Sequence, residues 1–511
     1  VEYKSDEYIV TSIEPYAFHN SKIEYFEVHT NLVEIKEGAF LGSSIKEIRI
    51  PVNSKLRKIG KNAFAFTSID EIYIPKSLVE IGEGFFGNIY LNRIRVDKKN
   101  PNYTNFKEQM ILAKSDVNQE NFDILFHCYK AKRIINIPDF IKIIQSYSFA
   151  QLGFREITFS ANSQLQKINE YAFLGGLIRK IVFPKHLRII GDGAFKQCEY
   201  LENIVFPDDS EIEEIGKNSF SKCPIQTFFV PSNLKRIGER AFYECDNLTN
   251  IEIPMNSNLQ IIEERAFAFT KINKIFIPSN LTELKDGWCN STTYLNIVEI
   301  SPKNKKYSLY NKMILGKSNI SQKNYDILVF CARNFEGKIK IPSSIEIIAH
   351  SAFNECKQLE EINFFDYPKL RIIDKYAFFF SSIKKFNVPP QLTHICERAF
   401  SSCEQLRTFY IPMNSKLEII DNYAFTYSAI ENIHFPSHLK FIGHHSFQLC
   451  QNLEHVQIPE NSKLRSINDF SFNKCKKLES IDIPLNVKIV SIGNYALAES
   501  AIQEFSFPHH L

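Results

Sequence analysis

The sequence predicts a repeat solenoid built mainly from short β-strands, and three observations predict it. A phenylalanine that usually follows alanine recurs along the whole chain. Successive copies commonly lie 22 or 25 residues apart, as from Phe378 to Phe400 and from Phe400 to Phe425. Each copy also carries a short apolar run that usually ends at proline. A unit this small can bury its apolar side chains only against its neighbours, so the units should stack into one continuous core.

About eighteen repeats of 22–25 residues can be aligned on this phenylalanine. Trp288 and Leu497 are placed in the phenylalanine position of two degenerate copies. The other copies carry Phe18, Phe40, Phe64, Phe86, Phe149, Phe173, Phe195, Phe220, Phe242, Phe267, Phe353, Phe378, Phe400, Phe425, Phe447 and Phe472.

Each repeat is expected to contain a strand, a return segment and a turn. In residues 45–50, Ile48 and Ile50 alternate with polar residues, which predicts a strand with one buried face. Pro51 ends the strand, because proline lacks the N–H that a continuing ladder would use. Leu56 to Ile59 should return along the other side, and the following Gly-x-x-Ala-Phe should form a tight turn or short helix that directs the ring inward.

The spacing alternates between long and short steps. Long steps contain Cys-x-x-Leu and Pro-x-Asn-Ser-Lys-Leu, as in residues 403–417, whereas short steps contain Pro-x-x-Leu, as in residues 389–392. The period is therefore often a pair of repeats, 47 residues long, as from Phe353 to Phe400.

Two matching segments interrupt the array. MILAKS and NFDILFHC (110–115 and 121–128) correspond to MILGKS and NYDILVFC (313–318 and 324–331) at a displacement of 203 residues. Each pair of apolar runs predicts a hairpin-like island that keeps the core sealed. An island could be a docking or dimerising knob, but we favour a purely structural role. The expected organisation is an N-terminal repeat block (1–96), a first island (97–133), a central block (134–300), a second island (301–338) and a C-terminal block (339–511).

The consensus L-x-x-I-x-I-P-x-x-L-x-x-I-G-x-x-A-F-x-x-C resembles the BspA-like leucine-rich repeats, also called the Treponema pallidum class. The Asn-Ser-Lys-Leu variant is similar to the trichomonad surface-protein branch of that family. The resemblance covers nearly the whole chain. It implies a curved, right-handed α/β-type solenoid, mainly β, with a parallel sheet on its concave side. It also implies a surface protein that adheres to host matrix, cells or other microbes, although a fold alone does not establish a function.

Composition and motifs exclude several other classes of function. The 511 residues carry a net charge of only +3, which gives no case for nucleic-acid binding. No run of 18 apolar residues occurs, so no membrane insertion is expected. The chain begins at Val1 without a visible leader and ends with FPHHL, where a further repeat would start, which indicates a fragment or a processed product.

No catalytic or cofactor-binding motif is supported, so we expect neither an enzyme nor a cofactor. GEGFFG (82–87) consists of repeat positions, and LGKS (315–318) lacks the first glycine of a phosphate-binding loop. No Cys-x-x-Cys pair supports a zinc site. Most cysteines follow the repeat phenylalanine by three residues and should form a buried ladder of free thiols: Cys198, Cys223, Cys245, Cys356, Cys403, Cys450 and Cys475.

A candidate binding site comes from the outward residue of each strand. In the central block this position reads Val182, Val205, Phe229 and Phe276, an apolar strip with no obvious core to enter. Exposed apolar patches of this extent often mark interfaces. Lys180, Asn250 and Lys274 are part of a polar rim on the neighbouring column. The strip could instead be covered by an island, a loop or a second copy of the chain, and both interpretations stay open.

These expectations combine into a non-catalytic cell-surface binding protein that recognises a protein or glycan ligand on the concave strip, with self-association as a further possibility. The alternative is an intracellular structural or scaffolding solenoid located in the cytoplasm.

Overall fold

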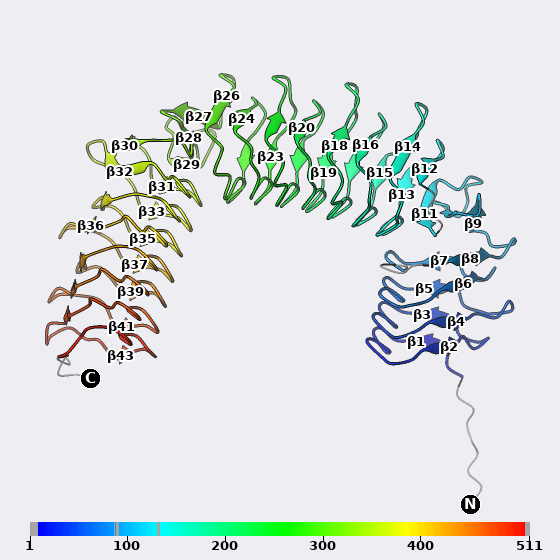
Figure 1. Ribbon diagram of the computed structural model, residues 1–511, viewed down its shortest axis with the longest axis horizontal. Coiled ribbons are helices and arrows are strands. Elements are labelled where there is room, and N and C mark those ends of the chain that lie inside the picture. Colours follow the sequence, from blue (N-terminus) through cyan, green and yellow to red (C-terminus); the bar gives the residue numbers. More distant parts are fainter. Residues whose placement is uncertain (1–8, 86, 88–90, 130–132, 506–511) are drawn as a thin grey trace, which may run out of the picture. The chain divides into compact units, whose positions relative to one another are not determined.

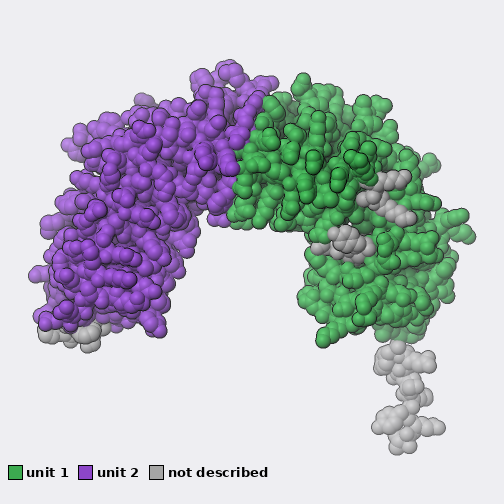
Figure 2. All heavy atoms as spheres, viewed as in Figure 1, with its two compact units in different colours: residues 1–248 green, residues 249–511 purple. Residues whose placement is uncertain are grey.

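The computed structural model describes residues 9–85, 87, 91–129 and 133–505. Phe86 and the terminal FPHHL therefore lie outside the described residues. In the described ranges the chain forms 43 β-strands and no helix. It divides into two compact units, residues 1–248 and residues 249–511, which are described separately below (Figure 2). The predicted division into five blocks stays a prediction.

Each turn of the solenoid usually carries one longer and one shorter strand, and Figure 1 shows the two kinds on different sides of the first unit. The longer strands of this unit are β2 (Tyr25–Glu27), β4 (Glu47–Arg49), β6 (Glu71–Ile74), β8 (Arg93–Val96), β12 (Ile134–Ile137), β14 (Glu156–Phe159), β16 (Lys180–Val182), β18 (Asn203–Val205) and β20 (Thr227–Phe229). The shorter ones are β1 (Ser12–Ile13), β3 (Glu34–Ile35), β5 (Lys58–Ile59), β7 (Glu80–Ile81), β13 (Ile143–Ile144), β15 (Lys167–Ile168), β17 (Ile189–Ile190), β19 (Glu214–Ile215) and β21 (Arg236–Ile237).

The second unit repeats this pattern. Its longer strands are β22 (Asn250–Glu252), β24 (Lys274–Ile277), β26 (Ile297–Ile300), β30 (Gly337–Ile341), β32 (Leu359–Phe364), β34 (Lys385–Asn387), β36 (Thr408–Tyr410), β38 (Asn432–His434), β40 (His455–Gln457) and β42 (Ser480–Asp482). Its shorter strands are β23 (Ile261–Ile262), β25 (Glu283–Leu284), β31 (Ile347–Ile348), β33 (Ile372–Ile373), β35 (His394–Ile395), β37 (Ile419–Ile420), β39 (Phe441–Ile442), β41 (Ser466–Ile467) and β43 (Ser491–Ile492). The described chain has 18 of these two-residue strands, in agreement with the number of repeats predicted.

Neighbouring repeats pair in parallel and in register. Ile35 lies opposite Ile59, and Ile59 opposite Ile81, so equivalent isoleucines form a buried column. In the longer strands only the centre faces inward: Ile48 is buried, while Glu47 and Arg49 are exposed. This is the alternation expected for strands with one face on the core. The predicted parallel, mainly β solenoid is confirmed.

The repeat phenylalanines form the centre of the core. Phe149, Phe173 and Phe195 are fully buried, and the planes of successive rings lie within 4° of each other at centroid distances of 4.9 and 4.8 Å. In the second unit Phe378, Phe400 and Phe425 stack in the same way, at 4.8 and 5.2 Å. The spacing of the rings thus matches the spacing of strands in a sheet, about 4.7–4.9 Å.

The Gly-x-x-Ala-Phe segment forms a tight turn rather than a short helix. The backbone enters the left-handed region two residues before and two residues after the phenylalanine, as at Tyr147 (φ 59°) and Gln151 (φ 57°) around Phe149. The amide of Phe149 donates to Ala172 O of the next repeat at 2.7 Å, so the turns also stack through hydrogen bonds.

The turn geometry corrects the predicted placement of Trp288 in the phenylalanine position. The amide of Phe267 donates to the carbonyl oxygen of Trp288, which places Trp288 in the alanine position. Left-handed Gly287 and Ser291 then lie two residues on either side of Cys289. Cys289, not Trp288, therefore occupies the phenylalanine position, and the indole of Trp288 fills the alanine position before it.

The double period has a structural counterpart in the first unit. Its longer strands pair in twos, β2 with β4, β6 with β8, β12 with β14 and β16 with β18. The first three pairs are 22 residues apart in register and the fourth 23, whereas the longer loops at residues 51–56 and 160–165 separate β4 from β6 and β14 from β16. The strand ladder is therefore interrupted on this face, while shorter strands such as β13, β15, β17, β19 and β21 form a continuous ladder. In the second unit β30 to β42 form one seven-stranded sheet.

Both interruptions of the repeat pattern are antiparallel, as predicted for hairpin-like islands. The first contains β9 (Tyr103–Phe106), β10 (Met110–Ala113) and β11 (Ile124–Cys128), and the second β27 (Tyr307–Tyr310), β28 (Met313–Gly316) and β29 (Ile327–Cys331). The last strand of each island returns to parallel pairing, with β13 or β31. The first strand of each island was not predicted, because Tyr103–Phe106 and Tyr307–Tyr310 lack long apolar runs.

A buried tyrosine connects each island to the preceding repeat. Tyr307 Oη accepts a hydrogen bond from the amide of Leu284 at 2.8 Å, and Tyr103 Oη accepts one from the amide of Ile81 at 2.9 Å. Tyr307 Oη also donates to Thr282 O at 3.3 Å. Burial raises the pKa of Tyr307 to about 12, so the hydroxyl remains a neutral donor and acceptor. The side chain thereby replaces a strand-to-strand hydrogen bond where the repeat pattern changes.

We expect Phe400→Ala to destabilise the second unit by about 3–5 kcal/mol, because the change removes a fully buried ring and leaves a cavity between two others. Urea denaturation followed by circular dichroism measures the effect. Tyr410→Ala, which truncates a ring that is 57% exposed, is the control and should cost less than about 0.5 kcal/mol. Equal losses in the two variants would contradict a central role for the phenylalanine column.

We expect Tyr307→Phe to cost about 1 kcal/mol or more and to accelerate amide exchange at Leu284, because the change removes the hydroxyl that accepts a hydrogen bond from this N–H and keeps the ring. Hydrogen exchange measured residue by residue tests this. Tyr310→Phe, on an exposed ring of the same strand, is the matched control. Unchanged protection of Leu284 would show that the tyrosine does not replace the strand pairing.

Candidate interaction surface

Three residues of the predicted strip lie exposed on the longer strands of the first unit. Val182 is 50% exposed, Val205 39% and Phe229 59%. Val182 lies directly opposite Val205 in the β16–β18 register. β20 follows through a hydrogen bond from the amide of Gln226 to Glu202 O at 3.4 Å. We call these three residues the apolar row.

The remaining members of the predicted site lie in the second unit. Phe276 is half-buried rather than fully exposed, between the buried Ile275 and Ile277 of β24. Lys274 Nζ forms an ion pair with Glu299 Oε1 at 2.8 Å, and Asn250 Nδ2 donates to Glu252 Oε1 at 2.8 Å. The structure thus brings Val182, Val205 and Phe229 onto one face, whereas the polar groups predicted in the second unit have partners of their own.

A hollow of about 750 Å³ opens beside the apolar row, where β14 and β16 do not pair. Its apolar wall includes Phe159, Val182 and Pro184. Its charged wall consists of Arg155, Arg179, Lys180, Lys185 and Glu156. Of the sequence-predicted residues, Lys180 and Val182 line it.

Three of the four cations have no acidic partner. Lys185 Nζ pairs with Asp209 Oδ2 at 2.9 Å. Arg155, Arg179 and Lys180 form no ion pair with any residue that the structure describes. Other exposed charges of the first unit pair between adjacent repeats, as Lys217 does with Glu239 at 2.7 Å.

Arginines recur at one position of three consecutive repeats. Arg133, Arg155 and Arg179 each directly precede a longer strand, β12, β14 and β16. All three are exposed, and the amide of Arg155 donates to Arg133 O at 3.0 Å. Like charges in neighbouring strands are unfavourable. We call these residues the arginine column. The sequence contains its signal, a repeated arginine at a fixed offset, but it lies one residue outside the strand and was missed.

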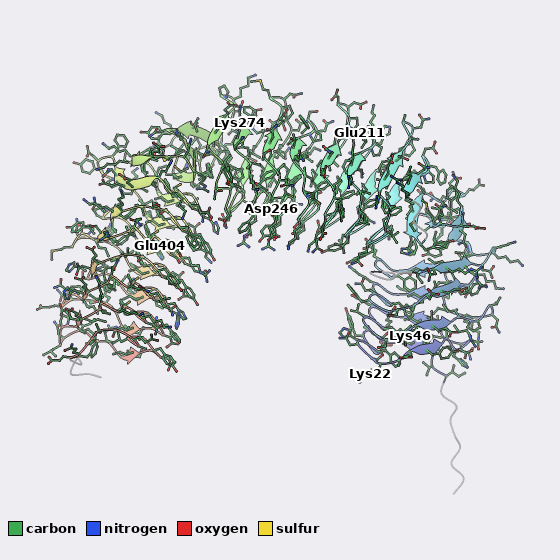
Figure 3. The ribbon with its side chains drawn as sticks, viewed as in Figure 1. Lys22, Lys46, Glu211, Asp246, Lys274 and Glu404 are labelled. Carbon is green, nitrogen blue, oxygen red and sulfur yellow. The ribbon has the colours of Figure 1, made fainter. Side chains whose placement is uncertain are left out.

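Elsewhere the first unit carries charges of both signs, as in the ion pairs of Lys46 with Glu24 and of Arg188 with Glu213. In the first unit, Glu211 lies on the side of the longer strands and Asp246 on the side of the turns (Figure 3). The arginine column is therefore a local feature of one face rather than part of a broadly basic surface.

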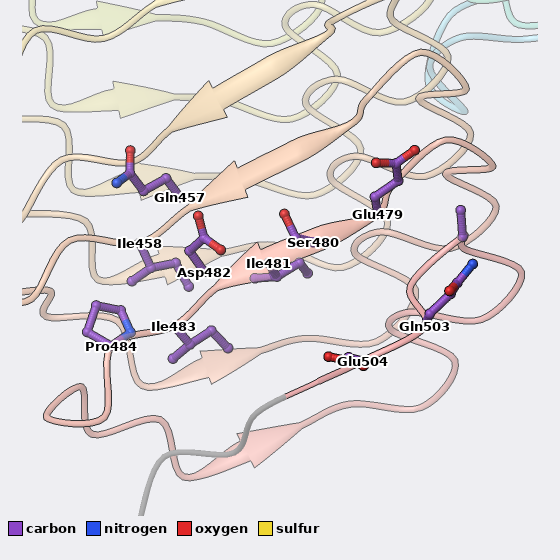
Figure 4. A pocket seen from close by; sticks show the side chains of 11 residues that line it. Gln457, Ile458, Glu479, Ser480, Ile481, Asp482, Ile483, Pro484, Gln503 and Glu504 are labelled. Carbon is purple, nitrogen blue, oxygen red and sulfur yellow. The ribbon is translucent and has the colours of Figure 1, made fainter.

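A second hollow, of about 860 Å³, lies beside β40 and β42 in the second unit (Figure 4). Glu479, Asp482 and Glu504 line it together with Ile481 and Ile483. It is acidic, and it adjoins the last described residues of the chain. Because its wall is formed by the end of the described array, we assign no role to it.

The thiols of the cysteine ladder form hydrogen bonds between neighbouring repeats. All eleven cysteines are free thiols, and the predicted ladder is buried. Cys198, Cys223 and Cys245 donate to Phe173 O, Phe195 O and Phe220 O at 3.0–3.1 Å. Burial raises the pKa of Cys245 to about 12, so its thiol remains protonated and can donate. The ladder therefore links repeats by hydrogen bonds as well as by packing.

One buried cation joins the second island to the next repeat. Arg333 is 4% exposed and donates from Nη1 to Ala352 O at 3.2 Å. Its Nη1 also lies 3.7 Å from Cys356 Sγ. Burial opposes ionisation of Cys356, but hydrogen bonding with Cys331 and the charge of Arg333 together lower its pKa to about 7. The contacts of Arg333 are internal, which indicates a structural role.

The described residues contain no cluster of three or more histidine, cysteine, aspartate or glutamate side chains arranged to hold a metal ion. They also contain no helix long and apolar enough to cross a membrane. In the tempting GEGFFG stretch, Gly84 (φ 67°) is one of the left-handed turn positions, in line with its interpretation as repeat sequence.

Comparisons with known proteins agree with this architecture. A family model described as the BspA type leucine rich repeat region matches six times, at residues 6–114, 123–228, 166–296, 213–331, 326–451 and 418–511. The comparison with curated proteins gave no match.

Two solved structures are similar in fold. A leucine-rich cell surface protein from Faecalibacterium prausnitzii is 18% identical, with a TM-score of 0.51 over 79% of this chain and 99% of that one. A leucine-rich repeat protein from Eubacterium ventriosum is also 18% identical, with a TM-score of 0.50 over 79% of this chain and 96% of that one. Since the family model matches nearly the whole described chain, the protein belongs to the BspA-type leucine-rich repeat family.

Proposed function

We propose that this protein is a non-catalytic binding protein of the cell surface, an adhesin-type solenoid that recognises a ligand with the longer-strand face of its first unit. The observation that carries the proposal is the apolar row of Val182, Val205 and Phe229 beside a hollow with unpaired cations. Solvent-exposed apolar side chains in contiguous positions often mark an interface. The ligand would be a host, matrix or microbial molecule, as the resemblance to adhesive surface proteins implies.

Two further observations support this proposal. A similar structure is described as a leucine-rich cell surface protein. Most of the unusual side chains, such as the ladder thiols and Arg333, are engaged inside the core. The exposed variable positions of the strands are then the natural place for recognition, because the scaffold positions are occupied by packing.

An intracellular scaffolding role is the second candidate. The observation that favours it is the presence of eleven cysteines without a disulfide, since disulfides are common in secreted proteins and rare in the cytosol. Limited proteolysis of intact cells of the producing organism distinguishes the compartments. Cleavage of the protein by an external protease supports the surface proposal, and full protection of the protein favours the cytoplasmic alternative.

We expect Val182→Asp and Phe229→Asp to leave the fold intact, because both side chains point into solvent. Ile181→Asp, one residue earlier in β16, should instead unfold the first unit, since it places a charge at a fully buried position. Circular dichroism and thermal denaturation measure both. If Val182→Asp behaves like Ile181→Asp, the exposed and buried faces of β16 have been exchanged.

We expect the double variant Val182→Asp/Phe229→Asp to bind at least about tenfold more weakly than the wild type to immobilised matrix proteins or cultured cells, because the apolar contact is lost. Binding is measured with labelled full-length protein. Val52→Asp/Phe66→Asp, two exposed side chains of the same unit, is the matched control. Equal binding by the two double variants, or no binding by the wild type to any surface, would refute the proposal.

A further inference from the structure

We propose that the hollow between β14 and β16 is a recognition site for an acidic peptide segment, in which carboxylate side chains alternate with apolar ones. This inference rests on the proposed binding function and adds the chemical class of the ligand. It follows from the charge of the hollow, the composition of its walls and its continuity with the apolar row.

Charge is the first step. Arg155, Arg179 and Lys180 line the hollow without an ion pair in the described part of the chain, and Glu156 is the only carboxylate among the described lining residues. Placing like charges on adjacent strands is unfavourable unless an anion lies between them. A carboxylate is a suitable anion, because a guanidinium can bind it through two parallel hydrogen bonds.

The composition of the walls is the second step. Phe159, Val182, Phe183, Pro184 and Pro207 line the apolar part of the hollow. No asparagine, glutamine, tyrosine or tryptophan occurs among its described lining residues. Its uncharged polar side chains are Thr158 and Ser160, so most of the remaining wall is either cationic or apolar. A peptide with acidic and apolar side chains matches both parts.

Continuity with the rest of the face is the third step. Arg179 directly precedes β16 and Val182 is the last residue of β16, so the two stand three residues apart, about 10 Å in an extended chain. The arginine column runs from Arg179 towards Arg155 and Arg133, and the apolar row runs from Val182 towards Val205 and Phe229. The two features meet only at β16. An extended peptide placed there meets cations on one side and apolar side chains on the other.

The test is a selection from a random displayed peptide library on the immobilised full chain. We expect enriched peptides that combine Asp or Glu with Leu, Val or Phe. Fluorescence polarisation of one enriched peptide should show affinity that falls with added salt. The variant Arg155→Ser/Arg179→Ser should bind it about tenfold more weakly, since each solvent-exposed ion pair contributes up to about fivefold.

The variant Arg57→Ser/Arg93→Ser is the matched control, because it removes two exposed arginines of the same unit that do not line the hollow. It should bind the peptide as the wild type does. No enrichment, enrichment of peptides without acidic residues, or equal binding by Arg155→Ser/Arg179→Ser would overturn the proposal.

A second measurement, retention on immobilised heparin, tests whether the anionic ligand is a sulfated polysaccharide rather than an acidic peptide. Heparin retention that is lost in Arg155→Ser/Arg179→Ser, without enrichment of acidic peptides, would identify a sulfated polysaccharide as the occupant and refute the peptide.

Failure of this inference is distinguishable from failure of the proposed function. If the surface binding lost in Val182→Asp/Phe229→Asp persists in Arg155→Ser/Arg179→Ser, the binding function stands and only the ligand class is wrong.

Discussion

The stacking of one phenylalanine on the next is the interaction on which the rest of this structure depends. Successive rings lie 4.8–5.4 Å apart between such pairs as Phe173 and Phe195 or Phe220 and Phe242. That distance is close to the spacing of strands in a sheet. Because ring stacking and strand pairing require nearly the same rise per repeat, both can be satisfied at once. The 22- and 25-residue steps can therefore alternate without breaking the core, since the extra residues are placed in surface loops.

The turn around each phenylalanine imposes a second constraint. It requires two left-handed residues, which glycine adopts without steric cost but bulky residues do not. In the second unit, the left-handed position two residues before the phenylalanine position nevertheless carries Tyr423, His445, Phe470 and Tyr495. Their rings stack at 4.6, 4.7 and 5.0 Å, so each strained backbone is accompanied by contacts with its neighbours. The same repetition that creates the strain also provides the stacking that offsets it.

The sequence was sufficient to predict the features that occupy fixed positions of the repeat, because such positions leave a periodic signal. These are the phenylalanine core, the short strands, the buried cysteines and the outward direction of Val182 and Phe229. It failed where a single repeat departs from the rest. Trp288 was placed in the phenylalanine position because tryptophan is a large aromatic residue, whereas the hydrogen bond from the amide of Phe267 and the left-handed turn residues around Cys289 place it in the alanine position. The half-burial of Phe276 depends on its surroundings, which alternation alone does not predict.

The candidate site illustrates the same distinction. The apolar row was found because it occupies the strand positions that alternation singles out. The hollow was not, because it arises from a missing strand pairing between β14 and β16 and from arginines just outside the strands. In the first unit the missing pairing coincides with a long step of the double period, whereas in the second unit β30 to β42 pair continuously despite the same alternation. The longer loop at residues 160–165 separates two strand pairs, and the hollow lies at this separation, while the shorter strands of the same repeats pair continuously. In the first unit, a longer loop that leaves the core intact thus lies beside a hollow whose walls carry side chains that the core does not need.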